Sequence, residues 1–250
     1  MEERPFVLSG GGIRGAAHLG VLRAFREAGI VPSAISGTSA GALVGALIAD
    51  GRSTEEASEM VREELKVPRL IRRPSLVSRR IANFLRRSLR HRNFEELPIP
   101  LHVSATDLEN GGQRIFSTGE LLPALMASCA IPLIFPPVKV NGIFHVDGGM
   151  SNNLPVEPFL KEKDRVIAVH VNPLPVFVPG KRSVMRTMDR IWHLNFREMV
   201  MRSAQGCHLF VEPPELSRFN MFELGKMEVI ERIGHAWTRT LLEKGTAPKP

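Results

Sequence analysis

The chain has 250 residues, of which 43% are hydrophobic and 24% charged, a composition that fits a globular protein and excludes a disordered one. Its formal net charge of +7 comes from one segment, residues 62–92, which holds eleven Lys or Arg against two Glu. Two cysteines, Cys129 and Cys207, are too few for a disulfide framework and lack metal-binding spacing, so we expect reduced thiols.

The lengths of the apolar runs indicate whether the chain could cross a membrane. None approaches the roughly 20 residues that cross a bilayer. The N-terminus has neither the basic start nor the apolar core of a signal peptide. We therefore expect a cytoplasmic protein whose membrane contact is peripheral, at the inner membrane surface.

The N-terminal part of the chain alternates short apolar strands with helices. The pattern predicts strand, helix, strand and helix over residues 6–9, 17–25, 34–36 and 42–49. Glycines follow both strands, at Gly10 and at Gly37. This alternation predicts a mainly parallel sheet with helices on its faces, where ligands bind at the carboxyl ends of the strands.

The rest of the chain continues as mixed strands and helices. We expect helices over residues 54–66, 186–202 and 224–242, and strands over 101–105, 114–116, 138–140, 143–146, 166–171 and 208–211. Asn141-Gly142 predicts a tight hairpin turn, because both residues tolerate positive φ. We expect a single domain over residues 1–250, with a basic helical insertion at about 66–98.

Residues 37–41 read Gly37-Thr38-Ser39-Ala40-Gly41 and match G-x-S-x-G. In this motif small residues allow a strained turn from strand to helix that presents the serine hydroxyl. The N–H of Ala40 and the positive helix terminus would favour a developing anion there. Ser39 is thus the candidate nucleophile, although five residues alone also fit a plain turn.

A second glycine cluster follows the first strand, as Gly10-Gly11-Gly12-Ile13-Arg14-Gly15. Unhindered glycine N–H groups at a helix start can form an oxyanion hole, with Arg14 as a cationic or structural anchor. The spacing also fits G-x-G-x-x-G of dinucleotide sites, and a tight turn would need glycines too. A dinucleotide site expects an acidic residue about 20 positions later, where this chain has a Ser-rich turn, so we expect no nicotinamide or flavin.

A candidate base lies at Asp147-Gly148-Gly149, after the second strand of the hairpin. Asp-Gly is also an ordinary turn signal. An aspartate in water has a pKa of about 3.9 and is a weak base, so catalysis requires a site that orients and desolvates it. Gly148 and Gly149 would permit close approach of the backbone.

These motifs, in order and spacing, resemble those of the patatin-like phospholipases. The set also includes residues 127–137, with Ser128 and Cys129, and Asn152-Asn153-Leu154-Pro155 after the aspartate. The resemblance implies an α/β protein with the three-layer α/β/α patatin-like fold and a mainly parallel central sheet. It covers nearly the whole chain, except for residues 66–98.

The resemblance also implies an activity, the hydrolysis of carboxylic esters of phospholipids, lysophospholipids or related lipids, with no cofactor and no metal. Ser39 would attack the carbonyl and form an acyl-enzyme, and Asp147 would take its proton without a histidine. Gly11, Gly12 and Ile13 would stabilise the oxyanion, and Arg14 matches the basic position of the family.

Two alternatives remain open. A Ser-His-Asp triad could use one of five histidines, although an α/β-hydrolase nucleophile usually follows more strands than precede Ser39. The candidates are His145, His170, His193, His208 and His235. The other alternative is a non-enzymatic protein on the same fold that binds anionic membranes.

The basic segment predicts an amphipathic helix. Its apolar residues are Val77, Ile81, Phe84, Leu85 and Leu89, and its cations are Arg79, Arg80, Arg86, Arg87 and Arg90. The helix could dock the protein on an anionic membrane through Arg79, Arg80, Arg86 and Arg87. Equally, its apolar stripe could pack on the domain and leave a solvated arginine face. We do not expect nucleic acid as a partner, because the segment has one Phe and no recognition motif.

Overall fold

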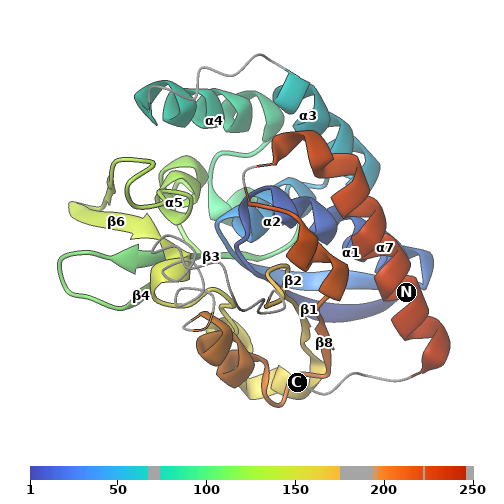
Figure 1. The fold of residues 1–250 in the computed structure, drawn as a ribbon. Helices are drawn as coiled ribbons and strands as arrows, with labels where there is room; N and C mark the ends of the chain where they lie inside the picture. The colour runs from blue at the N-terminus through green and yellow to red at the C-terminus, as the bar shows by residue number, and fades with distance from the viewer. Residues whose placement is uncertain (67–73, 175–193, 195, 222, 246–250) are drawn as a thin grey trace, which may run out of the picture.

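The structure is a computed structural model, which describes residues 1–66, 74–174, 194, 196–221 and 223–245 (Figure 1). A single eight-stranded sheet organises these residues in the order β5-β6-β3-β2-β1-β7-β8, with β4 paired to β3. The strands are β1 Glu2–Leu8, β2 Ile30–Thr38, β3 Leu101–Asp107, β4 Gln113–Phe116, β5 Val138–Val140, β6 Ile143–Asp147, β7 Ile167–Val169 and β8 Leu209–Val211.

The sheet is mainly parallel, as predicted. β8, β7, β1, β2 and β3 run parallel to one another, and β4, β5 and β6 form an antiparallel part at one side. The predicted hairpin joins β5 to β6, and Asn141 and Gly142 at its turn both have positive φ.

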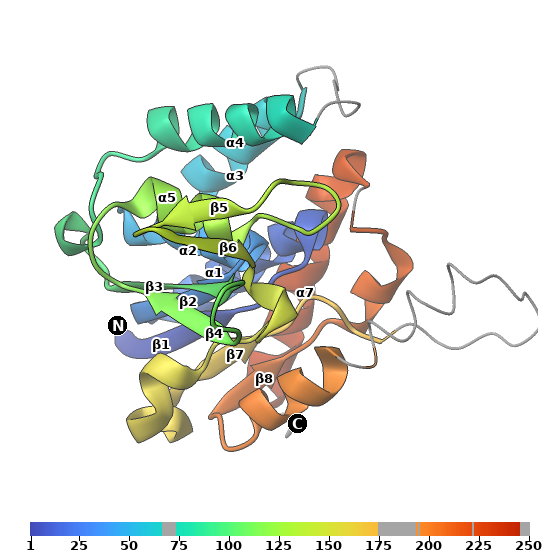
Figure 2. The same ribbon diagram turned by 90° about the vertical axis from the view of Figure 1, so that its left-hand side faces the viewer.

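Helices cover both faces of this sheet. The α-helices are α1 Ala16–Glu27, α2 Ala40–Ala49, α3 Thr54–Lys66, α4 Pro74–Ser88, α5 Leu121–Ser128 and α7 Met227–Lys244, with a further helix at residues 196–204. In Figure 2, α3, α4 and α5 lie above the strands, and the helix at 196–204 lies below them.

Alternation along β1 shows how the layers arise. Phe6 and Leu8 belong to the larger core, which packs against α1, α2, α5 and α7, whereas Val7 belongs to a smaller core with Val200 and Phe210. Because successive side chains of a strand point to opposite faces, the sheet lies between two apolar layers. The three-layer α/β/α fold is therefore confirmed.

The closing helix α7 packs unusually near to α1. A Cβ atom on Gly20 would lie 2.0 Å from the carbonyl oxygen of Glu231, and one on Gly234 would lie 2.3 Å from that of Ala17. A glycine on each helix lets the two backbones approach, so α7 is held against the N-terminal part of the chain.

The predicted basic helix exists as α4, and its apolar stripe faces the domain. Phe84, Leu85 and Leu89 are buried in the larger core, and Ile81 is partly buried against it. Of the two alternatives for this stripe, the structure therefore favours packing on the domain, so that the arginines form the outer face.

Some elements differ from the predictions. β2 begins at Ile30 although it contains Pro32, which is tolerated beside an irregularity in the β1–β2 register between Arg4 and Pro5. α5 was not anticipated, because it is only eight residues long and contains Pro123, which fits in a first helical turn. The helix expected over 186–202 is observed from residue 196 onward, and its earlier part lies outside the described residues.

Within the described residues, no helix combines the length and the apolar character needed to cross a membrane. Both cysteines are free thiols.

Candidate functional site

Ser39 lies at the turn from β2 into α2, as the motif predicts. Its backbone has φ 52° and ψ −121°, a conformation that costs free energy for a residue with a side chain. The turn is tight: a Cβ atom on Gly41 would lie 2.2 Å from the carbonyl oxygen of Leu8. The close contact between α2 and β1 therefore requires a glycine at position 41. The strained backbone conformation belongs to Ser39.

Ser128, at the end of α5, holds this turn in place. The backbone N–H of Ser39 donates to the Ser128 hydroxyl at 2.8 Å, and that hydroxyl donates to the carbonyl oxygen of Ser104 at 2.6 Å. One side chain thus ties the nucleophile turn to β3. The sequence motif includes Ser128, but the pattern alone predicts no role for it.

The pairing of β3 brings Ser39 and Asp147 together. β4 occupies one edge of β3 at both Ser104 and Ala105, so β2 and β6 share the other edge. There Thr38, the last residue of β2, pairs with Ser104, and Asp147, the last residue of β6, pairs with Ala105. The two strands approach end to end, and their ends carry the two candidate catalytic residues.

Asp147 is buried, with only 6% of its surface exposed. Its carboxylate accepts a hydrogen bond from the Gly149 N–H at 2.8 Å. Burial raises the pKa of Asp147 to about 6, while hydrogen bonds from the Ser39 side chain and from the Gly149 N–H oppose the rise. A carboxylate with this pKa is ionised at neutral pH and is a stronger base than an ordinary aspartate.

The glycine loop lies directly beside Ser39, the candidate nucleophile. A Cβ atom on Gly10 would lie 3.1 Å from the Cβ of Ser39, and one on Gly15 would lie 2.5 Å from the Cβ of Ala40. The Gly10 N–H donates to the side-chain oxygen of Asn153 at 3.1 Å. Asn153 therefore connects the glycine loop to the segment that follows Asp147.

The backbone donors of this loop divide into two groups. The N–H of Ile13 donates to the carbonyl oxygen of Met221 at 3.0 Å, and that of Arg14 donates to Gly11. In the part of the chain that the structure describes, no acceptor takes the N–H of Gly11 or Gly12. In this conformation the Ile13 N–H is therefore already engaged, whereas the N–H groups of Gly11 and Gly12 stay candidates for oxyanion donors.

Arg14 is an anchor for the loop. It is 4% exposed, and its guanidinium donates to the Phe219 carbonyl oxygen at 2.9 Å and to the Asn172 side-chain oxygen at 3.2 Å. Asn172 in turn donates to the Gly10 carbonyl oxygen at 2.5 Å. Of the cationic and structural roles considered for Arg14, these contacts favour the structural one.

The candidate histidines have other partners. His145 contacts the carbonyl oxygen of Ile143 in its own strand, His170 contacts Glu212, and His235 contacts Glu27. His208 is exposed, and His193 lies outside the described residues. Among the described histidines, none forms a hydrogen bond with Ser39 or Asp147.

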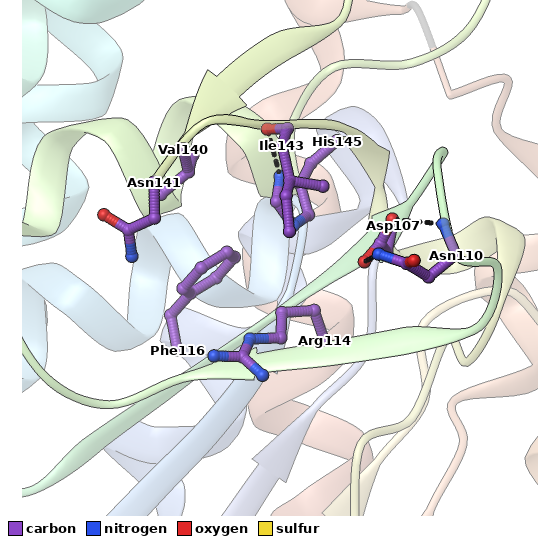
Figure 3. A pocket seen from close by; sticks show the side chains of 8 residues that line it. All are labelled: Asp107, Asn110, Arg114, Phe116, Val140, Asn141, Ile143 and His145. Atoms are coloured by element: carbon purple, nitrogen blue, oxygen red, sulfur yellow. Dashed lines mark hydrogen bonds between the residues drawn. The ribbon is translucent and has the colours of Figure 1, made fainter.

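A hollow of about 190 Å³ lies between β4 and the β5–β6 hairpin (Figure 3). Its lining residues are Asp107, Asn110, Arg114, Phe116, Val140, Asn141, Ile143 and His145. It thus reaches β6 two residues before Asp147 and includes neither catalytic candidate. Within the described chain, no three His, Cys, Asp or Glu side chains gather as metal ligands.

Comparison with known proteins identifies related sequences. The model of the patatin-like phospholipase family matches residues 6–160, which include the glycine loop, Ser39 and Asp147. An uncharacterized NTE family protein of Mycobacterium tuberculosis is 38% identical over 172 residues, which cover 66% of this chain and 48% of that protein. Mouse patatin-like phospholipase domain-containing protein 6 is 34% identical over 164 residues, 60% of this chain and 12% of that protein.

The chain therefore spans half or less of the length of these relatives. Among solved structures, VipD from Legionella pneumophila superposes with a TM-score of 0.58 at 15% identity, over 98% of this chain and 67% of that one. At this level of identity the likeness concerns the fold.

Proposed function

Because the chain belongs to the patatin-like phospholipase family, we propose that it is a serine acyl hydrolase with a Ser39–Asp147 dyad. Its substrates are carboxylic esters of phospholipids, lysophospholipids or related lipids. The observation that carries the proposal is the meeting of β2 and β6 on one edge of β3, which brings a strained serine to a buried aspartate.

In the first half of the reaction Asp147 accepts the proton of the Ser39 hydroxyl while Oγ attacks the ester carbonyl. A tetrahedral intermediate forms, with a negative charge on the former carbonyl oxygen. Protonated Asp147 then donates its proton to the departing alcohol oxygen as the carbon–oxygen bond breaks. The products are the free alcohol and an acyl group bound to Ser39.

The second half repeats these steps with water. Asp147, again ionised, takes a proton from a water molecule while the oxygen of that water attacks the carbonyl carbon of the acyl-enzyme. Collapse of the second intermediate returns the proton to Ser39 and releases the carboxylic acid. One residue thus acts as base and then as acid in each half, so no histidine is needed.

The N–H groups of Gly11 and Gly12 are the candidate donors for the oxyanion, together with that of Ala40 at the start of α2. Preorganised donors of this kind stabilise the transition state because they need no reorientation as charge develops. Arg14 and Asn153 position the loop through its backbone.

The proposal is tested with a fluorophosphonate probe, which labels an activated serine covalently. Peptide mass spectrometry of the labelled protein should find the adduct at Ser39. An adduct at another residue would remove Ser39 as the nucleophile. A panel of phospholipids, lysophospholipids and glycerides, with mass-spectrometric detection of released acids, then identifies the substrate.

A further inference from the structure

Outside the Ser39–Asp147 dyad, an open groove lies between α4 and α5. It measures about 450 Å³ and is open to solvent, and its lining residues are Ser78, Arg79, Ala82, Asn83, Arg86 and Met126. Arg79 and Arg86 are seven residues apart on α4, so they lie on one face, two turns and about 10 Å apart.

Pairing with Glu64 divides the arginines of α4 into two pairs. Arg80 and Arg87 both form ion pairs with Glu64 of α3, which is only 14% exposed. Arg87 also lies over the Phe84 ring, with its guanidinium carbon 5.7 Å from the ring centroid. These two arginines hold α4 to α3.

Arg79 and Arg86 have a different environment. Both are exposed, and among the described residues no carboxylate pairs with either. Arg86 donates to the neutral side-chain oxygen of Asn83 at 3.2 Å. The described lining of the groove therefore has two cations, the two neutral polar side chains of Ser78 and Asn83 and no acid, so it is complementary to an anion.

The loop after α5 carries an exposed apolar side chain. Leu133 is fully exposed, at a φ of 69°. In Figure 2 this loop runs beneath α4. A loop with an exposed apolar side chain that runs beneath a helix with unpaired cations is typical of surfaces that bind at the headgroup level of a membrane.

We propose that Arg79 and Arg86 form a docking site for the phosphate groups of anionic phospholipids in a membrane, an inference that rests on the proposed lipid hydrolase function. The sequence indicates four arginines for docking on a membrane, and the proposal keeps two of them, because Arg80 and Arg87 pair with Glu64. The binding is electrostatic, because the apolar stripe of α4 is buried in the core.

The groove is connected to the catalytic residues through α5. Met126 of α5 lines the groove, and Ser128, two residues later, accepts the N–H of Ser39. A membrane bound at the groove would therefore lie near the turn that carries the nucleophile. Docking would raise the local concentration of lipid esters without changing the chemistry at Ser39.

The test is co-sedimentation of the full chain with phosphatidylcholine vesicles that contain 0–40% phosphatidylglycerol, at low and at physiological salt. The variant R79Q/R86Q should bind the anionic vesicles about thirtyfold more weakly than wild type, since each basic residue near such a surface contributes about 1 kcal/mol. Wild-type binding should weaken steeply with salt.

Two control variants remove the same charge elsewhere. R202Q/R239Q changes exposed arginines outside α4, and R80Q/R87Q changes the pair bound to Glu64. Both should keep vesicle binding within about threefold of wild type. Equal losses in R79Q/R86Q and R202Q/R239Q would reduce the effect to net charge and overturn the site. If R80Q/R87Q unfolds, the comparison of R79Q/R86Q with R202Q/R239Q decides whether the loss of vesicle binding is specific to the groove.

Two further measurements distinguish membrane docking from a role in the active site and from binding of a nucleic acid. R79Q/R86Q should hydrolyse a soluble p-nitrophenyl butyrate ester like wild type and lose rate only on vesicle substrates. Loss on the soluble ester as well would assign these arginines to the active site and overturn docking. Binding of single-stranded RNA without binding of vesicles would assign the groove to another partner.

If no ester is hydrolysed at all, the vesicle assay still reports on the groove. Failure of docking and failure of the proposed function are therefore distinguishable.

Discussion

The surroundings of Ser39 and the helix pair α3–α4 use their polar side chains in opposite ways. Around Ser39 the polar groups are buried, and Ser128, Asp147 and Asn153 each bond a backbone N–H of the site. On α3–α4 most charged side chains lie outside, and the contact with the core is made mainly by apolar residues such as Leu85. We expect substitutions in the first region to change chemistry and those in the second to change stability or binding.

Ser39→Ala gives the largest expected effect. It removes the attacking oxygen and creates almost no cavity, so kcat on p-nitrophenyl butyrate should fall by about a thousandfold or more. The melting temperature should change little, because alanine keeps the Cβ and with it the same strained backbone. A folded Ser39→Ala protein with substantial activity would remove Ser39 from catalysis.

Asp147→Asn keeps the shape of the side chain and its hydrogen bond to Gly149, but it removes the base. We expect kcat to fall by about two to three orders of magnitude, with little change in KM. The matched control is Asp107→Asn, which changes a carboxylate on the same sheet whose partners are backbone and amide groups of its own turn. Comparable losses in both variants would contradict the specific role of Asp147.

The raised pKa of Asp147 sets two pH dependences. Because the base must be ionised, kcat/KM should fall about tenfold per pH unit below the pKa of about 6. The protonated form is favoured by the fold, so the stability that this group contributes is present at pH 4 and lost as pH rises through about 6. Asp147→Asn should therefore exceed wild type in stability at pH 8, by roughly 3 kcal/mol at most, and lose that advantage near pH 4.

Leu85→Ala tests the other region. Leu85 is fully buried, and its truncation should lower the free energy of unfolding by about 2–5 kcal/mol, measured by urea denaturation. The exposed neighbour Asn83→Ala should stay within about 0.5 kcal/mol. Folded Leu85→Ala should keep wild-type kcat on the soluble ester. A loss of kcat without a loss of stability would mean that α4 contributes to the chemistry.

Ser128→Ala tests whether a residue that bonds the backbone N–H of Ser39 affects chemistry as well as stability. It leaves the buried N–H of Ser39 without its acceptor, at a cost of about 1–3 kcal/mol, and should lower kcat about tenfold. Ser58→Ala, which removes a buried hydroxyl bonded to Glu231, should cost stability alone. If both variants keep full kcat, Ser128 is a structural residue only.

His145→Gln has the smallest expected effect. His145 lies two residues before Asp147, but its ring contacts the carbonyl oxygen of Ile143 and the Phe116 ring. We expect kcat within about threefold of wild type. A loss as large as that of Ser39→Ala, in a folded protein, would favour a triad.

The sequence predicted the local parts of the site well. The G-x-S-x-G motif needs only neighbouring residues, and its turn is found between β2 and α2. The meeting of Ser39 with Asp147 could not be read from patterns, because it depends on two strands sharing one edge of β3. The family resemblance supplied that pair.

The roles of Ser128, Asn153 and Asn172 were not predicted, for a physical reason. Each acts through hydrogen bonds to groups far away in the chain, and such bonds leave no periodic signal. The packing of α4 was undecided for a similar reason, since an amphipathic stripe looks the same whether it faces a core or a membrane.

The contact of Met221 with the glycine loop extends the candidate site beyond the part of the chain that carries the motifs. Residues 6–160 contain Ser39 and Asp147, yet the carbonyl groups of Phe219 and Met221 hold Arg14 and Ile13 of the loop. These carbonyls precede α7, which the close contact of Gly20 and Gly234 fastens to α1. We therefore expect a fragment cut after residue 160 to keep Ser39 and Asp147 but to lose the carbonyl groups that hold its glycine loop in place.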